Sequence, residues 1–104
     1  MVKDISSQDF DSILRMSEKP VVVDFMAEWC PYCKKLKPVI EEIAGERAGE
    51  IDVYYVNTDE REDLTDRYDI MTVPSVFVFR GGEVAGSIVN PGTKEAVLSL
   101  VYAK

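Results

Sequence analysis

The chain has 104 residues, of which 46% are hydrophobic and 30% charged, a composition typical of one folded domain covering residues 1–104. Twelve basic and nineteen acidic residues give a formal charge of −7, so the surface repels phosphate backbones and nucleic-acid binding is not expected. The chain has no run of about 18 apolar residues, and no apolar signal segment follows Met1. We therefore expect no membrane span and a cytoplasmic location.

Helical and strand-like patterns alternate along the chain. The first helix is expected to follow a capping residue, Ser6, and to end before Pro20. The β-branched apolar run that comes after Pro20 predicts a central strand covered on both faces. Asp59 is the expected cap of a short third helix, and Gly81-Gly82 is the expected turn of a hairpin. The expected helices span residues 7–18, 30–47, 59–68 and 93–103, and the expected strands span 21–26, 51–56, 76–79 and 84–89, with 2–5 as a further edge strand.

The order of these elements predicts an α/β fold. An early strand–helix–strand unit implies parallel pairing, and the later hairpin implies antiparallel pairing. We therefore expect a central mixed sheet of four to five strands, flanked by helices on both faces.

The only two cysteines, Cys30 and Cys33, lie three positions apart where a helix should begin. Residues at this spacing share one side of a helix, so the two sulfurs can form a disulfide with little backbone movement. Pro31 suits the first helical position, which makes Cys30 the expected N-cap. The unpaired N–H groups and positive dipole end of the helix then stabilise its thiolate. The pattern predicts a redox pair in which Cys30 attacks a disulfide and the more buried Cys33 resolves the intermediate.

Other uses of the cysteines are weaker hypotheses. The absence of histidine excludes Cys–His and Ser–His–Asp catalysis within this chain. Two thiolates supply half of a usual zinc or iron–sulfur ligand set, so a metal would need a second chain, glutathione or carboxylates. We expect no metal and no cofactor beyond the Cys30–Cys33 disulfide, and we expect a monomer.

The chain resembles thioredoxins over roughly residues 5–102. The likeness lies in the apolar strand carrying Asp24, the run Trp29-Cys30 that follows it, Pro38 five residues after Cys33, and Val73-Pro74 before a further strand. This resemblance implies a thioredoxin-like fold and reduction of protein disulfides, with the dithiol restored by a thioredoxin-reductase-type flavoprotein.

The resemblance also implies roles for single residues. Asp24 would be a buried carboxylate that moves the proton of the resolving cysteine, a role we favour over that of a purely structural aspartate. Pro74, in a cis peptide bond, would bring the backbone of Val73 beside the disulfide, where an extended substrate could pair with it. The expected substrate-binding residues are Trp29, Pro31, Tyr32, Val73 and Pro74.

Four features depart from the thioredoxin pattern. The dipeptide between the cysteines is Pro-Tyr, as in glutaredoxins, and the run Thr72-Val73-Pro74 also resembles that family. Thioredoxins usually carry a second tryptophan, often a lysine near the buried aspartate, and a glycine lining the substrate groove. This chain has Met26, Tyr55 and Asn90 at those places.

The departures leave three functional hypotheses open. The favoured one is a reductase of protein disulfides recharged by a flavoprotein. The alternative is a glutaredoxin-like enzyme recharged by glutathione, with Lys34, Lys35 and Arg80 as candidate cationic contacts. A third is a binding module that holds a partner without turnover.

Overall fold

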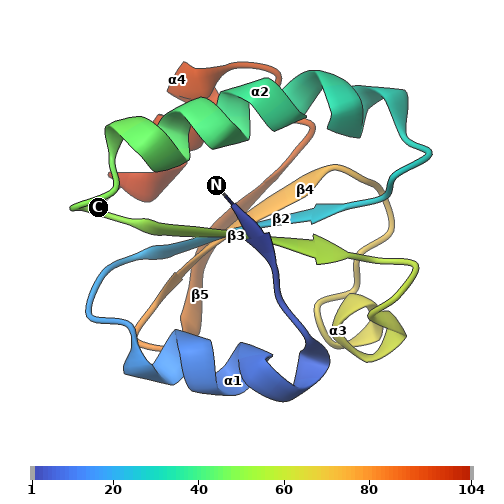
Figure 1. The fold of residues 1–104 in the computed structure, drawn as a ribbon, viewed down its shortest axis with the longest axis horizontal. Coiled ribbons are helices and arrows are strands. Elements are labelled where there is room, and N and C mark those ends of the chain that lie inside the picture. Colours follow the sequence, from blue (N-terminus) through green and yellow to red (C-terminus); the bar gives the residue numbers. More distant parts are fainter. Residues whose placement is uncertain (1, 104) are drawn as a thin grey trace.

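The computed structural model describes residues 2–103, and in this range five strands form one sheet in the order β1-β3-β2-β4-β5 (Figure 1). The central strand β2 runs parallel to β3 and antiparallel to β4, and β4 and β5 form the expected hairpin. This confirms the predicted mixed sheet. The strands are β1 Lys3–Asp4, β2 Val21–Met26, β3 Asp52–Asn57, β4 Ser75–Arg80 and β5 Glu83–Val89.

Four helices of the described residues cover the two faces of the sheet, with α2 and α4 on one side and α1 and α3 on the other (Figure 1). None of them is long and apolar enough to cross a membrane. The helices are α1 Ser7–Met16, α2 Pro31–Glu46, α3 Glu62–Arg67 and α4 Lys94–Val101.

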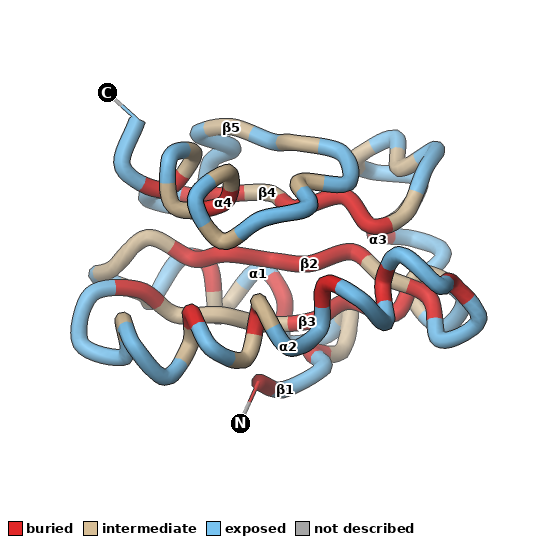
Figure 2. The backbone as a smooth tube through the Cα atoms, turned by 90° about the horizontal axis from the view of Figure 1, so that it is seen from above, coloured by how far each residue is buried: buried red, intermediate tan, exposed pale blue. Residues whose placement is uncertain are grey.

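Strand β2 is buried along nearly its whole length, as its continuous apolar sequence predicts (Figure 2). Its side chains alternate between two hydrophobic cores. Val21, Val23 and Phe25 pack with the core under α1 and α3, whereas Val22 packs with the core under α2 and α4. Because alternate residues of a strand share a face, Asp24 lies on the α2 side of the sheet.

All the predicted elements are present, and their bounds differ from the predicted ones by at most three residues. Helix α1 ends at Met16 rather than at residue 18, because the Ser17 hydroxyl donates to Lys19 O and to Asp52 Oδ2 and draws the chain into a turn. The predicted cap of the third helix is wrong: α3 begins at Glu62, and the Asp59 carboxylate does not cap it. The fold therefore follows the sequence pattern closely, and the exceptions arise where a side chain bonds a distant partner.

Candidate active site

Cys30 immediately precedes helix α2, whose first residue is Pro31. The Cys33 N–H donates to Cys30 Sγ at 3.2 Å, so the sulfur takes the place that a Ser or Asp side chain has in an ordinary N-cap. This confirms the predicted helix start. It places Cys30 Sγ where a free N–H group and the helix dipole both favour negative charge on sulfur.

Both cysteines are free thiols, and their exposed fractions are 3% for Cys30 and 4% for Cys33. The prediction that Cys33 is the more buried of the two is therefore wrong. The reason is a loop distant in sequence: Val73 packs against the small cluster formed by Ala27 and the two cysteines. Access to Cys30 is through a groove of about 470 Å³ that it lines together with Trp29, Tyr32 and Val73.

The loop that covers the cysteines contains a cis peptide bond between Val73 and Pro74, as the resemblance implied. The Cys30 thiol donates to the Val73 carbonyl oxygen at 3.6 Å. The backbone of Val73 therefore lies directly beside the sulfur that is expected to react.

Exposed apolar side chains surround the thiols. Trp29 is 67% exposed and Tyr32 57% exposed, as expected for contact residues, and Met71, which lines the same groove, is 84% exposed. The indole N–H of Trp29 donates to Asp59 Oδ2 at 2.9 Å, which explains why Asp59 does not cap α3. Sequence reasoning missed both Met71 and Asp59 as parts of this surface, although Met71 is an apolar residue just before the Thr72-Val73-Pro74 run.

Asp24 is 1% exposed, and neither of its carboxylate oxygens has a hydrogen-bond partner within residues 2–103. Burial raises the pKa of Asp24 from 3.8 to about 7, because the charged form loses its hydration without gaining a donor. A carboxyl group that titrates near neutrality can both accept and return a proton under ordinary conditions.

Burial also raises the pKa of Cys33, to about 12, with a further contribution from its hydrogen bond to Cys30 and a smaller one from the charge of Asp24. A thiol with so high a pKa keeps its proton at neutral pH and is a poor nucleophile. Reaction at Cys33 therefore requires a nearby base, and Asp24 faces the same pocket.

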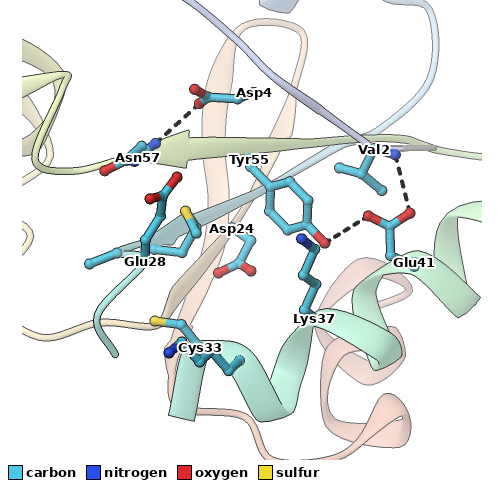
Figure 3. A pocket seen from close by; sticks show the side chains of 12 residues that line it. Val2, Asp4, Asp24, Glu28, Cys33, Lys37, Glu41, Tyr55 and Asn57 are labelled. Carbon is cyan, nitrogen blue, oxygen red and sulfur yellow. Dashed lines mark hydrogen bonds between the residues drawn. The ribbon is translucent and has the colours of Figure 1, made fainter. Parts of the chain in front are cut away.

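This pocket has a volume of about 660 Å³ and lies between the start of α2 and strands β2 and β3 (Figure 3). Tyr55 is the residue of β3 paired with Asp24, but its hydroxyl donates to Glu41 Oε2 at 2.9 Å instead of to Asp24. The described lining residues are Val2, Asp4, Asp24, Met26, Ala27, Glu28, Cys33, Lys34, Lys37, Glu41, Tyr55 and Asn57.

Comparison with known proteins places these features in one family, because the model of the family described as Thioredoxin matches residues 1–103. The chain belongs to the thioredoxin family. It is 40% identical over 96 residues to "Thioredoxin M-type, chloroplastic" of Spinacia oleracea, covering 92% of this chain and 53% of that protein. It is 37% identical over 98 residues to the thioredoxin of Streptomyces clavuligerus, covering 94% of this chain and 91% of that protein.

A third relative, the thioredoxin of Rickettsia bellii, is 32% identical over 101 residues, covering 97% of this chain and 96% of that protein. The chain thus spans about half the length of the chloroplast relatives that it matches and nearly the full length of these bacterial ones. The family assignment confirms the expected thioredoxin-like fold.

Within the thioredoxin family, the departures noted in the sequence lie on both sides of the cysteines. Met26, in place of a tryptophan, lines the pocket behind Cys33, where its smaller side chain leaves more room. Asn90 follows β5 with a positive φ of 47°, a conformation that glycine adopts freely, and its N–H donates to the Pro74 carbonyl at 2.8 Å. The exposed residue Asn90 is therefore joined through its backbone to the cis-proline loop.

Proposed function

We propose that the protein reduces disulfide bonds of other proteins by dithiol exchange through Cys30 and Cys33. The observation that carries this proposal is the position of Cys30 Sγ, which accepts the Cys33 N–H at the start of α2 and lies 3.6 Å from the Val73 carbonyl. A thiolate there is stabilised by the helix terminus and can meet an extended substrate along the backbone of Val73.

The exchange runs in two steps. The Cys30 thiolate attacks one sulfur of the substrate disulfide, forms a mixed disulfide, and releases the other substrate sulfur as a thiolate that takes a proton from solvent. Asp24 then accepts the Cys33 proton, and the Cys33 thiolate attacks Cys30 Sγ. This releases the second substrate sulfur as a thiolate, which takes a proton from Asp24 or solvent, and closes the Cys30–Cys33 disulfide, so the substrate gains the two electrons that the protein loses.

We propose that Trp29, Pro31, Tyr32, Val73 and Pro74 form the substrate-binding surface. Support comes from the exposure of Trp29 and Tyr32 beside the groove that leads to Cys30. The apolar rings can cover an unfolded or extended segment, while the backbone at Val73 offers hydrogen bonds that do not depend on the substrate sequence.

The electron donor is proposed to be a thioredoxin-reductase-type flavoprotein, supported by the family. Glutathione is the second candidate, favoured by the Pro31-Tyr32 dipeptide and the Thr72-Val73-Pro74 run. We further propose that the protein acts as a monomer in the cytoplasm, a compartment that keeps thiols reduced. The word "chloroplastic" in several relatives' names describes those proteins.

Reduction of insulin disulfides tests the proposal. The wild-type protein is expected to turn over with NADPH and thioredoxin reductase and to do so more slowly with NADPH, glutathione and glutathione reductase. Cys30→Ser should abolish turnover, whereas Cys33→Ser should trap a mixed disulfide detectable by mass. Equal behaviour of the wild type and Cys30→Ser, without turnover, would instead indicate a binding module, and the mass of the wild type in solution tests the monomer.

A further inference from the structure

The pocket behind Cys33 contains a buried carboxylate, Asp24, that forms no hydrogen bond and a lysine, Lys37, that forms no ion pair among residues 2–103. Both oxygens of Asp24 lack hydrogen bonds among the described residues. In the same range, Lys37 forms none of the ion pairs that hold Lys19 and Lys94. Both side chains line the same pocket, so a carboxylate and an ammonium group that could form an ion pair share one space.

The position of Lys37 follows from the helix. Cys33, Lys37 and Glu41 are spaced four residues apart on α2, and residues at this spacing form one stripe along a helix. All three line the pocket. Figure 3 shows the Lys37 side chain reaching from α2 toward the Tyr55 hydroxyl, with the Asp24 carboxylate on the neighbouring side of the same space.

The strands supply no cation to this space. Tyr55 occupies the position paired with Asp24 on β3, and its hydroxyl is engaged by Glu41. The remaining charged groups at the pocket are acidic, except Lys34 and Lys37 on α2. The titratable and charged side chains that face Asp24 here are Asp4 from β1, Glu28 from the loop before Cys30, Cys33, Lys34, Lys37 and Glu41 from α2, and Tyr55 from β3.

We propose that Lys37 is a positioning residue of the exchange reaction: its ammonium group stabilises ionised Asp24 across the pocket that both line, and so keeps that carboxylate able to take the proton of Cys33. The catalytic consequence of this proposal rests on the proposed function. The cation comes from helix α2, on the stripe of Cys33, rather than from the strand beside Asp24. A long, flexible lysine stem lets the charge approach when Asp24 ionises and withdraw to water when Asp24 is protonated.

The first test is a titration of the Asp24 carboxyl carbon by NMR in the oxidised protein, in which neither sulfur titrates and no turnover is needed. Lys37→Met is expected to raise the Asp24 midpoint by about 0.5–1 pH unit, as expected for one partly solvated charge. Lys37→Arg should keep the wild-type midpoint. Lys35→Met is the matched control, because it removes the same charge from the same helix at a position that does not line the pocket.

A second-site variant makes the test sharper. In Lys37→Met, the further change Tyr55→Lys places a cation on the strand beside Asp24 and should return the midpoint to the wild-type value or below. Lys37 is exposed, so Lys37→Met should fold normally. Equal midpoints in Lys37→Met and Lys35→Met would overturn the proposal, as would a larger shift in Lys34→Met than in Lys37→Met.

The catalytic readout is the rate at which Cys33 resolves a mixed disulfide. At pH 6 Lys37→Met should slow this step about threefold to tenfold, in proportion to the lost ionised Asp24, and at pH 9 it should leave the rate unchanged. A slowing that is the same at both pH values would indicate a structural role and overturn the proposal. If the wild type reduces no protein disulfide, the proposed function fails, but the NMR midpoints still test the action of Lys37 on Asp24.

Discussion

Replacing Asp24 by asparagine should stabilise the protein in a manner that depends on pH. The pKa of Asp24 is raised from 3.8 to about 7 by burial. Below about pH 3.8 the carboxyl group is protonated in both the folded and the unfolded chain. Between these values only the unfolded chain releases the proton, so stability falls as pH rises and the loss is complete above about pH 7.

The size of the effect follows from the shift. At about 1.4 kcal/mol per pH unit, the raised pKa corresponds to about 4 kcal/mol of lost stability at pH 8, and Asp24 is buried enough for little of this to be screened by solvent. An asparagine has the same shape and no charge, but its amide can remain without hydrogen bonds at a cost of about 1–3 kcal/mol. The amide cost is the same at both pH values and cancels from their comparison, so we expect Asp24→Asn to gain about 3–4 kcal/mol at pH 8 relative to its difference from wild type at pH 4.

Urea unfolding of the oxidised protein, measured from pH 4 to pH 8, gives the free energies by linear extrapolation. The oxidised form is used because its cysteines do not titrate. Asp66→Asn, an identical substitution at an exposed position of α3, is the control and should show no comparable trend. A difference between Asp24→Asn and wild type that is constant across this range would refute the argument from burial.

Three further predictions concern other departures and contacts. Replacing Pro31-Tyr32 by Gly-Pro should lower the reduction potential by about 40–70 mV, measured against glutathione, and a wild-type value at or below about −270 mV would contradict this. Asn90→Gly should lower KM for a protein substrate about twofold to fivefold with kcat unchanged, since it opens the groove; an unchanged KM would show that the side chain does not obstruct binding. Gly86→Ala should lower the free energy of unfolding by about 1 kcal/mol, because the new Cβ would lie 2.7 Å from Leu100 Cδ1. An equal loss in a Leu100→Ala background would show that this clash is not the cause.

The elements predicted best are those whose cause is local. A continuous β-branched run forms β2 over the predicted residues 21–26, because such a run is stable only between two covering layers. The start of α2 was also predictable, since Cys30 followed by Pro31 satisfies the cap and the first helical position. In both places the deciding residues are adjacent in the chain.

The features that sequence reasoning missed depend on partners far away in the chain. Asp59 has the residue type and spacing of a helix cap, but the Trp29 indole N–H, 30 residues away, donates to it. The burial of Cys30 depends on Val73, which lies 43 residues further along the chain. Local propensity gives no information on such contacts, because a helix cap and a distant donor compete for the same carboxylate.

Asp24 depends on both a local cause and long-range contacts. Its place on the α2 face of the sheet follows from the alternation of β2, but its lack of a partner among residues 2–103 depends on long-range packing, in which the Tyr55 hydroxyl donates to Glu41. An apolar residue at this position would avoid the cost of burying a carboxyl group that ionises near neutrality. The same burial that destabilises the fold also brings the pKa of Asp24 near neutrality, where the carboxyl group can accept a proton and later return it. The instability at position 24 and the chemistry at Cys33 therefore have one physical cause. A substitution of Asp24 that stabilises the fold should also remove the base that deprotonates Cys33.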